Sequence, residues 1–308
     1  MPLISTLAGA SARGYGLFGA VDSGSAAGTG RGLFGVTNPT TNTQMEYLLI
    51  STAGNSTNFG TLTQARGPQG CGSNTRVVFG GGSGTNYIDY FTTATTGNAT
   101  TFGTLSVARS SSGSGGSQTR GIWGGGVPSG GGFTNNIEYV TIASTGNGTS
   151  FGSLTVSRSQ VGAAGSPTRL VFFGGEGPSA LDTIDYVTIA TTGNATTFGT
   201  LTSARSDLYS AMSSSTRAVH QAGYINQTTM GYVTIASTGN ATNFGDYTSS
   251  RYAVFGLSNS VTGIIGGGTS GTVMNKITIA TTGNATTAGS IAGSGTPIAG
   301  ASDCHGGL

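Results

Sequence analysis

The chain has 308 residues, a formal net charge of +2 and only 7% charged residues, whereas an ordinary soluble domain carries about 25%. Eleven of its twelve cationic residues are arginines spread along the whole length. No lysine-rich strip could therefore follow a phosphate backbone, and nucleic acid is not expected as a partner. Glycine accounts for 57 residues, but the apolar 35% comes in β-branched and aromatic clusters, which favours a folded chain over a disordered one.

Residues 1–7 lack the basic flank and long apolar stretch of a secretory signal, and no run of about 18 apolar residues follows that could cross a bilayer. We therefore expect a chain that is not exported by the usual route and is not inserted in a membrane. The two cysteines, Cys71 and Cys304, are too few for a disulfide framework. We expect two small buried thiols, with a bridge joining the chain ends as the alternative.

One sequence pattern recurs six times, most clearly at 184–205, where Ile-Asp-Tyr-Val-Thr-Ile-Ala precedes Thr-Thr-Gly-Asn-Ala-Thr-Thr-Phe-Gly. The repeated tyrosines are Tyr47, Tyr90, Tyr139, Tyr186 and Tyr232, and Lys276 takes the sixth position. These positions lie 43, 49, 47, 46 and 44 residues apart, and a period of roughly 40–50 residues is typical of propellers and other repeat arrays. We expect one domain, 1–308, with an N-terminal closing segment at 1–44, repeats at about 45–88, 88–137, 137–184, 184–230 and 230–274, and a C-terminal closing segment at 274–308.

The repeat at 109–158 shows how one unit should fold. Strands are predicted at 109–115, 119–123, 137–143 and 151–156, and we call them a, b, c and d. Strand a is rich in Ser and Gly, which suits a crowded ring centre, and strand b is apolar and ends at three glycines. Strand c carries apolar groups on both faces, and the segment between c and d has turn chemistry. Four short antiparallel strands without helical periodicity describe one propeller blade.

The two ends of the chain offer the parts of a shared blade. Sequence resembling strand b occurs at 14–19 and at Arg31–Gly35, and 297–308 resembles strand a. A blade built from both ends would leave no open sheet edge. We therefore expect an all-β propeller of six blades, each of four antiparallel strands, closed by the N- and C-terminal segments. Seven blades are the alternative, if the doubled N-terminal sequence forms a blade of its own.

The order of these residues resembles the kelch family. Kelch repeats run from an arginine through an apolar strand ending in a Gly-Gly pair to a tyrosine strand and a later aromatic residue. Here Arg66, the segment 77–81, Tyr90 and Phe102 follow that order. The resemblance implies a kelch-like propeller over about 12–308. The usual Trp is replaced by Phe in the last position, the fifth unit has His-Gln-Ala-Gly at 220–223, and the sixth has Lys276 and Ala288.

A second resemblance rests on residues 1–14, the Thr-Gly-Asn-Ala-Thr-x-Phe-Gly repeats and the His-Gly-Gly-Leu at 305–308. These are similar to Gly/Thr-rich virion proteins of marine tailed phages, especially those infecting cyanobacteria. The resemblance implies a particle component such as a tail fibre, tail-tip or capsid appendage. Its partners would then be other virion proteins and a host-surface glycan or protein, and its location would be the virion, assembled in the host cytoplasm.

The loops between strands b and c differ in length and content from unit to unit, and variable loops on a rigid scaffold are where recognition usually lies. We expect a partner-binding surface near Asn86, Tyr87, Phe133, Asn135 and Tyr224. The alternative for each of these residues is that the loops have diverged in sequence without any role in binding.

Five arginines follow strand d, at Arg66, Arg109, Arg158, Arg205 and Arg251. They could form an anion-binding ring at the channel mouth, or they could pair with Glu46, Asp89, Glu138 and Asp185, which strand direction places near the same end of the blades. We favour the paired arrangement, because an arginine in a Gly-rich sheet needs a partner for its planar fork of donors.

Catalytic chemistry finds little support in the sequence. The only histidines are His220 and His305, in unlike blade positions, and no strong carboxylate pair lies beside them. We expect no catalytic residue, no metal and no cofactor. The Asn-x-Ser/Thr sequences that begin at the repeated asparagines, one in each repeat, are interpreted as turns rather than glycosylation sites. The leading hypothesis is a non-enzymatic phage structural or receptor-binding protein, followed by an intracellular kelch-type interaction module and then by a glycan-active enzyme.

Overall fold

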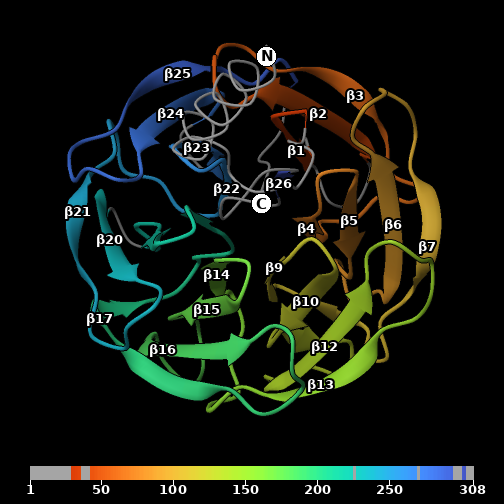
Figure 1. The fold of residues 1–308 in the computed structure, drawn as a ribbon, viewed down its shortest axis with the longest axis horizontal. Coiled ribbons are helices and arrows are strands. Elements are labelled where there is room, and N and C mark those ends of the chain that lie inside the picture. Colours follow the sequence, from red (N-terminus) through yellow and green to blue (C-terminus); the bar gives the residue numbers. More distant parts are fainter. Residues whose placement is uncertain (1–28, 36–41, 225–226, 269–270, 294–299, 303–308) are drawn as a thin grey trace, which may run out of the picture.

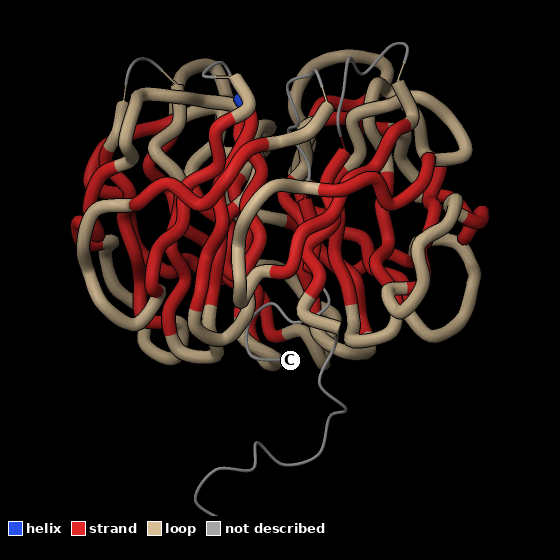
Figure 2. Tube along the Cα trace, turned by 90° about the horizontal axis from the view of Figure 1, so that it is seen from above, coloured by secondary structure: helices blue, strands red, loops and turns tan. Residues whose placement is uncertain are grey.

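The computed structural model describes residues 29–35, 42–224, 227–268, 271–293 and 300–302. They form six four-stranded antiparallel sheets arranged as a ring, a six-bladed β-propeller (Figure 1). Seen from the side, the sheets stand next to one another with loops at both ends (Figure 2). The predicted architecture is thus confirmed, with six blades in the described part of the chain. The second strand-b-like sequence at 14–19, Cys304 and His305 lie outside the described residues.

Within each blade, the strands run in the order a to d from the central channel to the rim. Blade 1 holds β26 (Gly300–Ser302), β1 (Arg31–Gly35), β2 (Gln44–Leu49) and β3 (Thr57–Thr61). Blade 2 holds β4 (Gln69–Gly72), β5 (Arg76–Gly80), β6 (Tyr87–Thr92) and β7 (Thr100–Thr104). Blade 3 holds β9 (Gly113–Gly116), β10 (Arg120–Gly124), β12 (Asn136–Thr141) and β13 (Thr149–Ser153).

The other three blades repeat this arrangement. Blade 4 holds β14 (Gly162–Gly165), β15 (Arg169–Phe173), β16 (Leu181–Thr188) and β17 (Thr196–Arg205). Blade 5 holds β18 (Ala211–Ser213), β19 (Arg217–His220), β20 (Thr229–Thr234) and β21 (Thr242–Asp246). Blade 6 holds β22 (Val254–Ser258), β23 (Thr262–Gly267), β24 (Val273–Thr278) and β25 (Thr286–Ser290).

The inner strand of blade 3 is shorter than the predicted strand at 109–115. Two residues form β8 (Arg109–Ser110), which pairs with β11 (Val127–Pro128) in the loop of the same repeat, and β9 begins only at Gly113. Between them, Ser111 adopts a φ of 57°. A left-handed residue cannot continue a strand, so the chain turns there from the outer edge of one blade to the centre of the next. Corresponding residues in blades 4 to 6 share this conformation, at Gln160, Asp207 and Ala253.

The ring is closed within blade 1 by strands from opposite ends of the described chain. Strand β26 pairs with β1 in an antiparallel register that places Gly32 opposite Ser302 and Phe34 opposite Gly300. The inner strand of this blade therefore comes from the C-terminal part of the chain, and its other three strands come from the N-terminal part. Blade 1 therefore has four strands like the other blades, and its edge at the channel is the short strand β26.

The hydrophobic core is divided into six clusters, one between each pair of neighbouring blades. In the cluster between blades 3 and 4, Phe151 and Ile122 of one blade pack with Leu170, Phe172 and Val187 of the next. Strand d carries a β-bulge at its phenylalanine, because Ile137 pairs with Gly152 and Glu138 with Ser150, which leaves Phe151 unpaired. The bulge directs this ring into the seam, where it meets Tyr139 edge-on at 5.9 Å.

The central channel is narrow because the inner strands carry mainly Gly, Ala and Ser. It encloses a cavity of about 30 Å³, which has room for about two water molecules. Serines link neighbouring inner strands: Ser114 donates to the Gly70 carbonyl, Ser213 to that of Gly165 and Ser302 to that of Ser258, each at 2.7 Å. The channel is thus part of the ring's packing and is too small for an organic ligand. No helix in the described residues is long and apolar enough to span a membrane.

Candidate binding surfaces on the two faces of the ring

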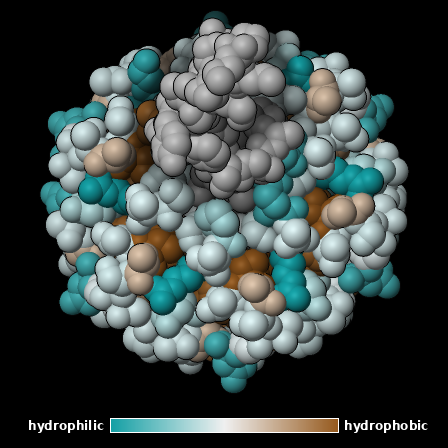
Figure 3. Space-filling model, viewed as in Figure 1, coloured by the Kyte–Doolittle hydropathy of each residue, from teal (hydrophilic) through white to brown (hydrophobic). Residues whose placement is uncertain are grey.

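The two ends of the blades form two different faces. The loop face, at the top of Figure 2, carries the loops between strands b and c and the junctions between strand d and the next strand a. The turn face, at the bottom of Figure 2, carries the turns between a and b and the Thr-Gly-Asn turns between c and d. Figures 1 and 3 look onto the turn face.

On the turn face, each Thr-Gly-Asn turn is bonded to the outer strand of the preceding blade. The amide of Thr104 donates to Oδ1 of Asn147 at 3.0 Å, and the amides of Gly146 and Gly148 donate to the carbonyls of Phe102 and Thr104. The same side-chain bond occurs at all six seams, accepted by Asn55, Asn98, Asn147, Asn194, Asn240 and Asn284. These asparagines therefore have a structural role in the turns, as predicted.

Five seams carry a further link on the turn face, which we call the arginine clasp. In blade 3, the guanidinium carbon of Arg120 lies 4.5 Å from the ring centroid of Tyr139, and Nη1 donates to the carbonyls of Ile189 and Ala190 in blade 4. The clasp arginines are Arg31, Arg76, Arg120, Arg169 and Arg217. Hydrophilic and hydrophobic residues alternate around this face in a pattern that recurs from blade to blade (Figure 3).

Below the loop face, three of the predicted arginine and acid pairs are present. Nη2 of Arg66 lies 2.8 Å from Oδ2 of Asp89, Nη2 of Arg158 lies 3.0 Å from Oδ2 of Asp185, and Arg109 pairs with Glu138. All six side chains are almost completely buried. Burial lowers the pKa of Arg109 and Arg158, and the partner carboxylates act in the opposite direction.

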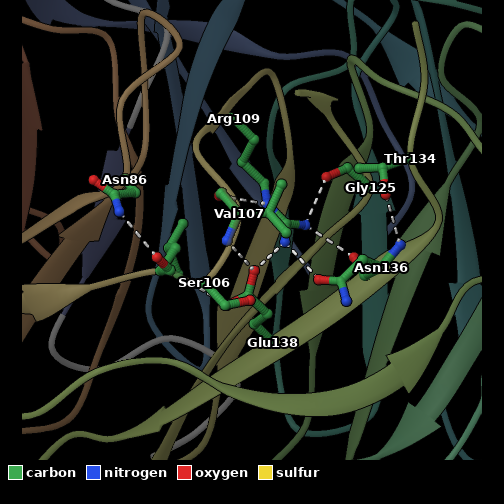
Figure 4. A network of polar contacts seen from close by, with 9 residues as sticks. Asn86, Ser106, Val107, Arg109, Gly125, Thr134, Asn136 and Glu138 are labelled. Atoms are coloured by element: carbon green, nitrogen blue, oxygen red, sulfur yellow. Dashed lines mark hydrogen bonds and ion pairs between the residues drawn. The ribbon is translucent and has the colours of Figure 1, made fainter. Parts of the chain in front are cut away.

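The pair in blade 3 is the centre of a larger network (Figure 4). Nη1 of Arg109 donates to the carbonyls of Gly125 and Asn136, at 3.0 and 2.9 Å. Glu138 also accepts from the backbone amides of Ser106 and Val107, at 2.6 and 3.3 Å. The carboxylate therefore joins the end of strand d in blade 2 to strand c of blade 3, which makes the pair a link between blades.

Three predicted members of this set find other partners in the described residues. Arg205 donates to the carbonyls of Ala222 and Thr229, and the position of its acid is taken by Gly231, opposite His220. Glu46 accepts from Ser56 and from the amide of Ala292. Arg251, whose acid position is Asn275, donates to the Val273 carbonyl. All five arginines are at most 4% exposed, so their donors are not presented to an anion at the channel mouth.

The five residues predicted to bind a partner fall into two groups on the loop face. Tyr87, Phe133 and Tyr224 are 40%, 38% and 48% exposed. Asn86 and Asn135 are half-buried, and their amides donate to the carbonyls of Leu105 and Leu154 at 3.2 and 3.5 Å. The two asparagines therefore hold strand c to strand d, and only the three aromatic rings are available to a partner.

Two further tyrosines on this face were not among the predicted residues. Tyr252 of blade 6 packs edge-on against Tyr224 of blade 5, with 5.0 Å between ring centroids. Tyr209 lies near Ser111 and Gln160 of the two preceding blades, and burial raises its pKa. Both tyrosines lie outside the repeated pattern, and that irregularity is the signal that could have found them.

The described residues contain no group of three or more His, Cys, Asp or Glu side chains that could hold a metal ion. His220 is buried, its Nδ1 lies 2.8 Å from the Gln221 carbonyl, and burial lowers its pKa to about 4. Cys71 is also buried, and burial raises its pKa, so its thiol is not activated. Neither group is placed to act on a substrate.

No protein-family model matches the sequence, and a search of curated proteins finds no match.

Proposed function

We propose that this chain is a non-enzymatic structural or receptor-binding component of a phage particle, such as a tail fibre, tail-tip or capsid appendage. Its scaffold is a kelch-like propeller, and its loop face recognises another virion protein or a host-surface glycan or protein. The phage assignment rests on the resemblance of the sequence to Gly/Thr-rich virion proteins. The kelch-like assignment rests on the order of arginine, glycine pair, tyrosine and aromatic residue in each repeat.

The main support for a binding role is the difference between the two faces. On the turn face, the repeated asparagines and arginines are used in bonds between blades. On the loop face, Tyr87 begins strand β6 beside one loop, Phe133 and Tyr224 lie in loops of unlike length, and all three keep much of their surface exposed. A rigid ring with dissimilar aromatic loops at one end is the usual form of a recognition surface.

The chemistry of these loops fits a neutral partner. The loop that carries Phe133 also contains Ser129, three glycines at 130–132 and Thr134. Rigid aromatic rings among Ser, Gly and Asn residues provide contact area together with adaptable hydrogen bonds, as they do in antibody loops. The nearby arginines and acids are buried in pairs, so they add little charge to this surface.

Mass spectrometry of purified particles tests the location. Detection in washed virions at a constant copy number is expected. Absence from them would remove the phage assignment and leave an intracellular kelch-type interaction module as the better hypothesis.

Adsorption of the purified chain to host cells tests the surface. The triple variant Tyr87→Ala, Phe133→Ala, Tyr224→Ala should lose adsorption, whereas Val261→Ala, at a position 57% exposed on the turn face, should retain it. Equal adsorption by the two variants would contradict a recognition role for the loop face. Cleavage of purified host glycan by the chain would instead favour an enzyme.

A further inference from the structure

The seam between blades 6 and 1 differs from the other five. By strand register, Thr262 takes the position of the clasp arginine, since it lies opposite Thr278 as Arg217 lies opposite Thr234. Lys276 takes the position of the tyrosine, and Ala288 takes that of the seam phenylalanine. All three side chains that fill the other seams on the turn face are therefore replaced at this one.

A pocket of about 230 Å³ occupies this seam. Its apolar walls include Ile50, Ala53 and Ile277, and its polar groups include Thr262, Lys276 and Asn284. Ile50 and Ser51 correspond to Ile142 and Ala143, whose carbonyls accept the clasp of Arg76. The pocket thus extends into the place where a guanidinium group lies in the other seams.

The walls of the pocket are held by the bonds that all six seams share. The amides of Gly54 and Ser56 in blade 1 donate to the carbonyls of Ala288 and Ser290 in blade 6, at 2.8 and 3.0 Å. The amide of Ser290 donates in return to Oδ1 of Asn55 at 3.0 Å. The replaced side chains have left the backbone of the seam intact, so the pocket is preformed.

Lys276 is the one lysine of the chain, and its side chain is exposed at the pocket. Its ammonium group makes no hydrogen bond or ion pair with any described residue. An ammonium group with three free donors is suited to a carboxylate. The threonine hydroxyl and the asparagine amide can bond to ligand hydroxyls, and the half-buried Ala53 offers a small apolar contact, since Ile50 and Ile277 are buried.

We propose that this pocket binds an acidic monosaccharide unit, a single sugar ring whose carboxylate pairs with Lys276. The volume is below the roughly 300–1,000 Å³ of pockets for larger ligands, so it suits one ring rather than an extended chain. This site is on the turn face, and it does not depend on the phage assignment or on the loop face.

A second groove of about 230 Å³ on the same face provides an internal comparison. It belongs to blade 1 and is lined by Arg31 and Tyr47. There the guanidinium group already donates to the Thr93 carbonyl and lies over the tyrosine ring. Its cation is engaged within the protein, and we expect no comparable affinity for an acidic sugar.

Titration with D-glucuronate, D-glucose and acetate at low ionic strength, followed by calorimetry, tests the proposal. Saturable binding of glucuronate is expected. Glucose, which lacks the carboxylate, and acetate, which lacks the sugar ring and its hydroxyls, should each bind more weakly, by about tenfold or more. Lys276→Met should weaken glucuronate by about tenfold or more. Thr192→Glu, which changes the net charge equally at an exposed turn of blade 4, should leave binding unchanged.

A repeat-restoring variant checks the location independently. Thr262→Arg, Lys276→Tyr, Ala288→Phe should fill the pocket and abolish glucuronate binding, while a melting temperature at or above that of the parent shows that the ring is intact. Three results would overturn the proposal: no saturable binding by the parent chain, unchanged binding by Lys276→Met, or acetate binding as tightly as glucuronate, which would indicate a bare charge contact.

Discussion

The carbonyl oxygen of Gly97 in blade 2 lies where a β-carbon on Gly60 of blade 1 would have to be, since an added β-carbon would come within 2.0 Å of that oxygen. At every seam an added β-carbon would lie 2.0–2.2 Å from a glycine carbonyl oxygen of the neighbouring blade. The glycines concerned are Gly60, Gly103, Gly152, Gly199, Gly245 and Gly289. The Phe-Gly and Thr-Gly-Asn parts of the repeat are therefore two halves of one contact between neighbouring blades.

Gly60→Ala should lower the free energy of unfolding by about 2–3 kcal/mol, because backbone blocks the added methyl group. Gly97→Ala is the matched control, since no atom lies within 4 Å of its added β-carbon, and its effect should stay within about 1 kcal/mol. Urea unfolding of the two variants measures the difference. Similar losses would mean that the contact between blades does not restrict Gly60.

Glu138→Gln should destabilise the ring by about 3–5 kcal/mol, because it leaves the buried guanidinium of Arg109 without its counter-charge. Asp182→Asn removes a carboxylate from an exposed position of the loop face and should change stability by no more than about 0.5 kcal/mol. Thermal unfolding at neutral pH compares them. A melting temperature unchanged by Glu138→Gln would contradict a structural role for the pair.

Phe102→Ala should cost about 3–5 kcal/mol, because the ring is 3% exposed and fills the seam between blades 2 and 3. Phe133→Ala removes the same ring from a position that is 38% exposed, and its loss should be below about 1 kcal/mol. Chemical denaturation tests the pair of variants, and a small loss at Phe102 would place its ring at the surface.

His220 should make stability depend on pH. Burial lowers its pKa from the ordinary value of about 6.5 to about 4, so the unfolded chain binds the proton more tightly. The stabilisation from the neutral ring is fully present above pH 6.5 and is lost as the pH falls from 6.5 through 4, by about 3 kcal/mol in total.

The variant His220→Phe isolates this contribution, because Phe79 and Phe172 occupy the corresponding positions opposite an acid in blades 2 and 4. The parent chain should lose more stability than His220→Phe between pH 7.5 and pH 5, measured as the shift of the urea midpoint. Equal losses of stability in the parent chain and in His220→Phe would show that His220 is not the cause of the pH dependence.

The sequence predicted the ring because the spacing of its repeats is typical of propellers. The direction of the predicted strands also placed Arg109 and Glu138 at the same end of a blade. Gly231 precedes Tyr232 where an acid precedes the other repeat tyrosines, so the missing acid of Arg205 is visible in the sequence. The sequence could not predict that the carbonyls of Ala222 and Thr229 accept from Arg205 instead. The sequence also could not predict the contacts of Asn147 and Gly60, because each contact joins residues of two blades and exists only once the ring is closed. Lys276 is visible in the sequence as a departure from the repeat. The pocket beside it could not be predicted, because residues of the neighbouring blade form part of its lining.

Strand β26 has three residues, yet it supplies the inner strand of the first blade. Its partner Gly32 is about 270 positions earlier in the chain. During synthesis on the ribosome, blade 1 therefore lacks its inner strand until residues 300–302 have been translated. Blades 2 to 5 can assemble as each emerges, but the circle is completed by a contact of very high sequence separation, which makes this last step the slow one in folding.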